Sequence, residues 1–474
     1  MEPGQLSWPV KTTMVSRAQN TPVPINFSTA LKNVRDRKSG LANDEELITW
    51  KPPEGGSDGY SYRARPPPLS SVLDPSLLAL AENADQVDSL ENVSDSLRGR
   101  LADMICDLGK MDIRVFRLFV KGSSTEIYIK DCSWLTEEED EEFLKTFEDF
   151  DAESLMVLQL EQCGQLTDDD VLRKTLARSP NSLPNLSVIS LKGAYKLSND
   201  GLNALVISAP ALQSVNLSGC FLLTDVGINI LAESLGSILR ELCIDYCTKI
   251  DAMEILPALN KFEHLEVLSV AGIETVCDQF VSDLLTACGH NIKKLNFSNC
   301  LKLTDTSLVI IGGKCNGLLS LNISNLNKLT NLGLEHLADG CRCIETLILC
   351  RNSFSDDAVA AFLEASGRYL KELSLNSVAE VGSSTAFSLA NFSRDLLSLD
   401  LSWCQKITDQ ALGMIVDYCL SLKLLKLFGC TQITNVFLDG HSNAKVHVIM
   451  SSNSRLEILC LLQLSEDISA DIMT

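Results

Sequence analysis

One phrase returns along this chain, and its regular spacing limits what the chain can fold into. It is clearest between residues 399 and 412, where alternating leucines are followed by Cys404, Thr408 and Asp409. Aligned on the position of Cys404, the phrase occurs twelve times, at positions 132, 163, 194, 220, 247, 273, 300, 326, 352, 378, 404 and 430. The first two steps are 31 residues and the later ones 26 or 27. A period of this length is typical of a solenoid, in which each unit packs only on its neighbours.

The strand half of each repeat follows from simple alternation. Leu399 and Leu401 alternate with Ser398, Asp400 and Ser402. Side chains of a strand point to opposite faces in turn, so the leucines face a core and the residues between them face outward.

The helical half begins at Thr408. A threonine at this place is a good N-cap, and Asp409 is favourably placed at the positive end of the helix. Apolar residues between Ala411 and Val416 then form the inward stripe. The pattern therefore predicts an α/β leucine-rich-repeat solenoid of the cysteine-containing subtype. We expect a horseshoe with a parallel sheet on the concave side, helices on the convex side and a helical N-terminal cap.

The cysteines follow the repeat and do not read as a disulfide framework. Of 17 cysteines, seven hold the repeat position and four end helices: Cys132, Cys163, Cys220, Cys247, Cys300, Cys404 and Cys430, and then Cys288, Cys315, Cys341 and Cys419. Ile273, Leu326 and Val378 replace the cysteine in other repeats, as expected for a buried packing position. We therefore interpret the thiols as reduced and the protein as intracellular.

Charge and hydropathy restrict the partners. The formal net charge is −22 and the sequence pI is about 4.7, which predicts no strong direct nucleic-acid binding. No apolar run reaches membrane-span length and the N-terminus lacks a signal-peptide pattern, so we expect no membrane association. An acidic block at residues 137–153 favours either a solvated convex face or a docking surface for a basic partner. The nucleus is the expected compartment, with the cytoplasm as the alternative.

Three regions are predicted along the chain. Residues 1–68 form a mostly disordered tail with one short helix at Phe27–Arg37, which we expect to dock either on the solenoid or on a partner. Residues 69–120 form a helical cap that is also a candidate degenerate adaptor-binding segment. Residues 121–474 form the solenoid of about 12 to 13 repeats, with a last short strand predicted at Leu456–Leu461.

No catalytic pattern stands out. The chain has no glycine-rich phosphate loop, and its cysteine pairs lack zinc-site spacing. Cys288 and His290 can be written as a nucleophile pair, but both lie at a helix end between repeats, where structural roles are the rule. We therefore predict a protein that is not an enzyme, with no catalytic, cofactor-binding or metal-binding residues.

Function is then expected on the concave face, where the repeat identifies the outward residues. The last repeats carry aromatic and charged residues that are typical of interface anchors: Arg351, Asp400, Trp403, Lys426 and Phe428. The first rungs add Tyr128 and Lys130. The alternative for Trp403 and Phe428 is packing beneath the C-terminal segment. The expected ligand is a protein substrate.

The cysteine-bearing repeat resembles that of F-box leucine-rich-repeat proteins, the substrate receptors of cullin-based ubiquitin ligases. A closer resemblance is to leucine-rich-repeat subunits of nucleotide excision repair of the radiation-sensitivity type, found in yeasts and plants. It rests on Pro75–Leu78, Leu118–Gly122, Asp131–Thr136 and Val157–Cys163, and covers most of residues 25–440. Residues 69–120 do not supply an F-box.

This resemblance implies a function and partners. The chain is expected to be a substrate-recognition subunit of a cullin-type ubiquitin ligase, working with an elongin-like adaptor, a cullin and a repair ATPase. Ser76, Leu77 and Ala81 match the adaptor box of such proteins, whereas Asp85 stands where the box has an apolar residue. The alternatives are an F-box-like receptor that uses a Skp-type adaptor outside DNA repair, and a protein-binding scaffold outside ubiquitin pathways.

Overall fold

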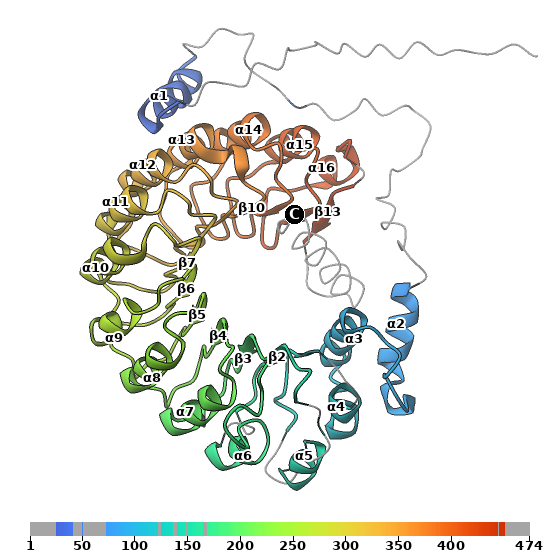
Figure 1. Ribbon diagram of the computed structural model, residues 1–474. Coiled ribbons are helices and arrows are strands. Elements are labelled where there is room, and N and C mark those ends of the chain that lie inside the picture. Colours follow the sequence, from blue (N-terminus) through green and yellow to red (C-terminus); the bar gives the residue numbers. More distant parts are fainter. Residues whose placement is uncertain are drawn as a thin grey trace, which may run out of the picture.

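The computed structural model describes residues 25–40, 50, 73–121, 125–135, 140–147, 150, 152–164, 168–443 and 445–450. Within these ranges, 13 strands form one sheet whose spatial order follows the chain from β1 to β13, and every paired neighbour is parallel. The strands line the inside of a horseshoe and the helices lie on the outside (Figure 1). The predicted leucine-rich-repeat solenoid is confirmed.

The strands are short and recur once per repeat. They are β1 (Glu126–Ile129), β2 (Val157–Leu160), β3 (Val188–Ser190), β4 (Ser214–Asn216), β5 (Glu241–Cys243), β6 (Val267–Ser269), β7 (Lys294–Asn296), β8 (Ser320–Asn322), β9 (Thr346–Ile348), β10 (Glu372–Ser374), β11 (Ser398–Asp400), β12 (Leu424–Lys426) and β13 (His447–Ile449).

Helices precede the sheet and then alternate with its strands. Before β1 lie α1 (Phe27–Lys38), α2 (Leu73–Glu82), α3 (Asp95–Asp107) and α4 (Ile113–Val120). The repeat helices are α5 (Asp140–Thr146), α6 (Asp169–Lys174), α7 (Asn199–Ser208), α8 (Asp225–Leu235), α9 (Ala252–Leu259), α10 (Asp278–Cys288), α11 (Asp305–Lys314), α12 (Asn331–Gly340), α13 (Asp356–Ser366), α14 (Ser383–Phe392), α15 (Asp409–Tyr418) and α16 (Asn435–Gly440). The predicted strand at Leu456–Leu461 and most of the tail 1–68 lie outside the described residues.

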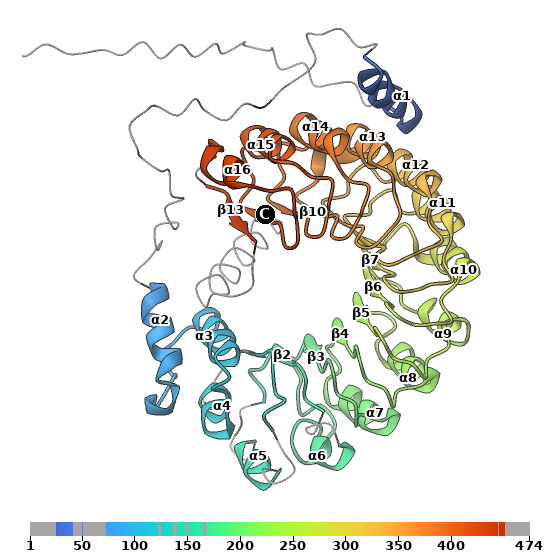
Figure 2. The ribbon, with the colours of Figure 1, turned by 180° about the vertical axis from the view of Figure 1, so that it is seen from behind.

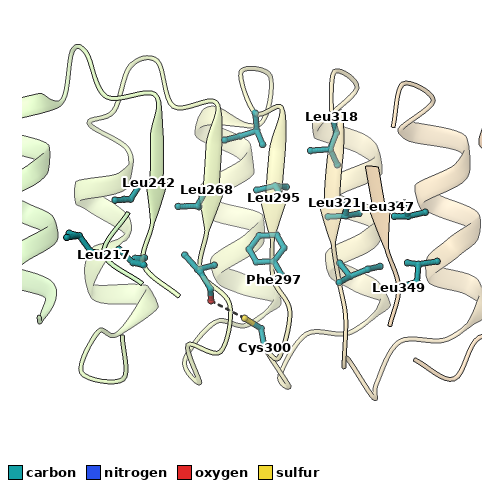
Figure 3. Packing of buried hydrophobic residues seen from close by; sticks show 14 of the residues in the cluster. Leu217, Leu242, Leu268, Leu295, Phe297, Cys300, Leu318, Leu321, Leu347 and Leu349 are labelled. Carbon is teal, nitrogen blue, oxygen red and sulfur yellow. Dashed lines mark hydrogen bonds between the residues drawn. The ribbon is translucent and has the colours of Figure 1, made fainter. Parts of the chain in front are cut away.

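The core is a ladder of apolar residues in register. Leu242, Leu268, Leu295, Leu321 and Leu347 occupy the middle of successive strands, pair rung to rung and are buried (Figure 3). Each leucine thus packs on the same residue of both neighbouring repeats. The alternation seen in the sequence sets this register, because a slip of one residue would turn the whole ladder outward.

A second ladder runs through the repeat-position cysteines. The Sγ of Cys300 donates to the carbonyl oxygen of Val270 in the preceding repeat at 3.3 Å (Figure 3), and Cys404 does the same to Leu375 at 3.2 Å. Burial raises the pKa of Cys300 to about 12, so the thiol keeps its proton. Asn352 replaces the cysteine in one repeat and donates instead from its amide to Ile323 at 2.8 Å. Ile273, Leu326 and Val378 are also buried at this position, so it accepts a buried side chain with or without a donor and does not require a disulfide.

A third ladder joins the helix starts of successive repeats. Thr408 caps α15 as expected, accepting from the backbone N–H of Ala411. In several repeats an aspartate follows the cap and does more than face its own helix. Asp278 accepts from both the backbone N–H (3.0 Å) and the hydroxyl (2.6 Å) of Thr304 in the next repeat. Asp305 makes the same pair of contacts to Thr330. This cross-repeat role is not visible in a single repeat of the sequence.

The N-terminal helices close one end of the solenoid. Phe116 of α4 packs against the rings of Trp134, Phe143 and Phe147 in the first repeat, with centroid separations of 5.8, 5.7 and 6.2 Å. Arg98 of α3 is buried, and its Nε donates to the carbonyl oxygen of Val93 at 2.9 Å. These contacts cover the apolar edge that the first repeat would otherwise expose to water.

The aspartate ladder makes a pH-dependent contribution to stability. Burial alone would raise the pKa of Asp278, but hydrogen bonds from Ser307 and Thr304 outweigh it and hold the pKa below its usual value. A lowered carboxyl pKa stabilises the fold above the unfolded-state value of about 3.9, and this stability is lost as the pH falls through the folded-state pKa. We expect Asp278→Ala to cost about 1–3 kcal/mol of unfolding free energy at pH 7. Denaturant unfolding between pH 3 and 7 checks this. The difference in unfolding free energy between the variant and the unchanged protein should become smaller below about pH 4. A difference that does not depend on pH would contradict the stabilising role of the Asp278 carboxylate.

Candidate partner-binding surface

Four of the residues singled out in the sequence lie together at the C-terminal end of the sheet. Asp400 ends β11 and Lys426 ends β12, and the parallel register places them side by side. Trp403 and Phe428 follow in the turns after these strands, where the backbone N–H of Trp403 donates to the carbonyl oxygen of Phe428 at 2.6 Å. We call these four residues the late concave surface.

Trp403 is displayed by its backbone conformation. Its φ is +63°, in the left-handed region, and 56% of the residue is exposed. The ring lies over Gly429 of the next repeat, where an added Cβ would approach the ring atoms to about 2.5–2.7 Å. A bulky residue in this conformation costs free energy, and such strain concentrates at functional sites. Because β11 ends at Asp400, Trp403 lies at the rim of the sheet, beyond the end of this strand.

The same left-handed turn position recurs through the solenoid and identifies a residue that the sequence reasoning missed. Small or flexible residues hold it in most repeats: Gly193, Gly219, Gly272, Asn299, Asn325, Ser377 and Gly429. The larger residues with exposed side chains at this position are Gln162, Tyr246, Arg351 and Trp403. Tyr246 accepts from the amide of Asn299 at 2.7 Å and covers Gly272. The glycines that recur three residues after the ends of the strands were the available signal.

Phe428 differs from Trp403 in its surroundings. It is partly buried and packs against a small apolar cluster formed by Leu397, Leu424 and Ile449 at the same end of the sheet. Its backbone N–H donates to the Ser402 hydroxyl at 3.2 Å. The aromatic pair therefore combines an exposed indole with a ring that is already anchored.

The charges of the late concave surface are held unequally. Asp400 accepts from the backbone N–H of Ser402 at 2.9 Å, which fixes its carboxylate in the turn. Lys426 is partly buried. Burial raises the pKa of Glu372 on β10, and the positive charge of Lys426 acts in the opposite direction.

The remaining concave candidates lie elsewhere. Arg351 lies in the turn after β9, two repeats before Trp403. Tyr128 lies on β1 at the other end of the sheet, where burial, and then the charge and hydrogen bond of Glu126, raise its pKa to about 12. Lys130 is paired with Asp107 of α3 at 2.6 Å. The structure thus separates an early group from the late concave surface.

The candidate adaptor residues share α2 but not one face of it. Leu77 and Ala81 are buried in the core, whereas Ser76 is exposed and Leu80 is 42% exposed. The helix packs on α3. Leu77 and Ala81 can therefore reach an adaptor only if α2 separates from the cap, while Ser76 and Leu80 are presented already. Asp85, which stands where the adaptor box has an apolar residue, is also exposed.

Two kinds of feature are absent from the part of the chain that the structure describes. Within it, no three side chains of histidine, cysteine, aspartate or glutamate gather as a metal site. None of its helices combines the length and apolarity that crossing a membrane requires.

Fold and surface together define a class, the leucine-rich-repeat solenoids with a displayed concave face. No family model matches the chain. The DNA repair protein rhp7 of Schizosaccharomyces pombe is 25% identical over 353 residues, covering 72% of this chain and 60% of the relative. The DNA repair protein RAD7 of Saccharomyces cerevisiae is 25% identical over 361 residues, covering 73% and 61%. The chain therefore spans about three fifths of the length of these two relatives.

Two other comparisons agree with this. F-box/LRR-repeat protein 4 of Bos taurus is 30% identical over 168 residues, covering 35% of this chain and 25% of the relative. The crystal structure of the yeast Rad7 and Elc1 complex matches with a TM-score of 0.63 at 19% identity, covering 90% of this chain and 98% of that one, and so shows the same fold. The resemblance to rhp7 and RAD7, with F-box leucine-rich-repeat proteins as further relatives, is confirmed.

The strain at position 403 predicts a difference between two substitutions. Trp403→Ala removes the ring but keeps a side chain in the left-handed region, whereas Trp403→Gly also removes the strain. We expect the glycine variant to be more stable than the alanine variant by about 1 kcal/mol. Denaturant unfolding measures the difference.

Leu401→Ala is the matched control, because this buried neighbour belongs to the leucine ladder. It should cost about 2–5 kcal/mol. If Trp403→Ala costs as much as Leu401→Ala, Trp403 is a packing residue and not a displayed one.

Proposed function

We propose that this chain is a non-enzymatic substrate-recognition subunit of a cullin-type ubiquitin ligase linked to nucleotide excision repair, acting in the nucleus. The observation that carries the proposal is the likeness to rhp7 and RAD7, which are DNA repair proteins, over nearly three quarters of the chain. The matching solved solenoid is that of yeast Rad7 in complex with Elc1, which supports an elongin-type adaptor as a partner.

The late concave surface is the proposed substrate site. Trp403 offers an exposed ring, and Lys426 and Asp400 supply both charges beside it. Aromatic residues with neighbouring charges are the usual anchors of protein interfaces, and truncating a central one costs about 2 kcal/mol or more. Arg351, Tyr128 and Lys130 are proposed as outlying contacts along the same concave side.

The adaptor is proposed to bind the exposed side of α2. Ser76 and Leu80 are presented to solvent there, whereas Leu77 and Ala81 hold the helix to the cap. A helix with an apolar residue exposed beside a buried face suits a partner that docks without unfolding the cap. The cullin and a repair ATPase complete the proposed assembly.

Two other functions remain as alternatives. An F-box-like receptor of an SCF-type ligase is favoured by the local likeness to F-box/LRR-repeat protein 4. A scaffold outside ubiquitin pathways is compatible with the fold alone. In each of the three functions the sequence-wide charge of −22 leaves contact with nucleic acid to a partner.

Affinity purification with mass spectrometry tests the proposal, using the tagged chain and its Trp403→Ala and Leu80→Glu variants. We expect an elongin-type adaptor, a cullin and a repair ATPase with the unchanged chain. Leu80→Glu should lose the adaptor and cullin, because it places a charge on the apolar docking side. Trp403→Ala should keep the adaptor and lose a substrate by at least about 30-fold in affinity, the equivalent of 2 kcal/mol.

Leu77→Glu is the control on the same helix, and should lower the melting temperature because it buries a charge. A Skp-type adaptor in place of the elongin type would favour the F-box-like alternative. Absence of every ligase component would contradict the proposal and favour the scaffold.

A further inference from the structure

The helix α1 lies against the outside of the solenoid, where it packs on helices that are far from it in the sequence. It runs beside α13 and touches α12 (Figures 1 and 2). Phe27, Ala30 and Val34 are buried, and their spacing of three and four residues places them on one face of the helix. This convex side is solvated in an ordinary solenoid, so α1 covers a surface that the repeats do not themselves need covered.

The start of α1 is fixed by acidic residues of α12. The backbone N–H of Phe27 donates to Asp339 at 3.1 Å, and the hydroxyl of Ser28 donates to Glu335 at 2.8 Å. Asn26 caps the helix by accepting from Thr29. Two carboxylates of the solenoid thus replace water at the positive end of the helix.

The basic end of α1 is paired with α13. Arg37 forms an ion pair with Glu364, whose side chain is almost fully buried, and its guanidinium lies 4.5 Å from the ring centroid of Phe387. Lys38 pairs with Asp357 at 3.1 Å. A buried carboxylate is costly without a counter-charge, and here the counter-charge comes from a separate segment.

Trp50 continues the contact along the same side. Its Nε1 donates to Asp417 of α15 at 2.9 Å and the residue is buried. Beneath it lies Gly413, where a Cβ would come within 2.1 Å of the ring. Glycine is unfavourable in a helix interior, and the matching position of another repeat holds the exposed Val309. Gly413 is therefore explained by the docked indole and not by the helix.

We propose that the outer side of α12–α15 is a docking site for a basic amphipathic helix, and that α1 and Trp50 occupy it as a releasable strap. The site offers an apolar surface that is flanked at both ends by carboxylates, which bind the polar groups of α1 and Trp50. These carboxylates are Glu335, Asp339, Asp357, Glu364 and Asp417. A partner helix with an aromatic start, an apolar stripe and a basic end fits the same surface. The strap and such a partner exclude each other.

The test is a competition in the full chain. Ser28→Glu places a negative charge against Glu335 and Asp339, although an acidic residue at that place favours the isolated helix. It therefore releases the strap without weakening α1. The probe is a labelled peptide of residues 25–40, followed by fluorescence anisotropy. We expect the peptide to bind the Ser28→Glu chain at least tenfold more tightly than the unchanged chain, whose site is occupied.

Two further variants separate docking from misfolding. Adding Glu335→Lys to Ser28→Glu restores an attractive contact, so the strap should return and peptide binding should fall again. Gly413→Ala leaves α1 unchanged and favours its own helix, but it should displace Trp50 and speed proteolysis after residue 40 several-fold. The proposal is overturned if the peptide binds the unchanged chain, the Ser28→Glu chain and the doubly substituted chain equally, or if it binds none of them. It is also overturned if Gly413→Ala leaves the rate of proteolysis unchanged.

Discussion

Polar groups at the start of each repeat are satisfied by a neighbouring repeat, and the rest of the structure depends on this. Cys300 donates back to Val270, Thr304 donates back to Asp278, and the amide of Gly272 donates forward to Ser298 at 2.8 Å. A buried polar group without a partner costs more than a hydrogen bond contributes. The repeats therefore stack in one register, and stability accumulates from each interface to the next.

A scaffold stabilised in this way leaves the outward residues free to differ. The ladders use the side chain of the strand leucine and, in many repeats, those of the cysteine and of the aspartate, but not the side chains that face outward from the sheet or that stand at the left-handed turn position. Tyr246 and Trp403 occupy a turn position that glycine or asparagine would fill with less strain. Their display is more readily explained by recognition than by folding, since the neighbouring repeats fold with smaller residues there.

The sequence predicted what lies within one repeat and missed what lies between distant elements. Alternation around Leu401 gave the strand, and Thr408 gave the helix start. The second contact of Asp278 depends on the distance between repeats, which no single repeat contains. Leu77 matches an adaptor box in sequence, yet its burial depends on how α2 packs against α3. The position at which α1 docks on the solenoid could not be predicted from the sequence either, because Arg37 and Glu364 are 327 residues apart.

The substrate protein is proposed to be held by the displayed residues at the end of the sheet and not by the helices behind it. Site-specific photo-crosslinking tests it most directly, with a benzophenone side chain at position 428 or at position 309 of α11, where Val309 is 44% exposed. We expect a covalent product with the substrate protein from position 428 and none from position 309. A product from position 309 alone would contradict it.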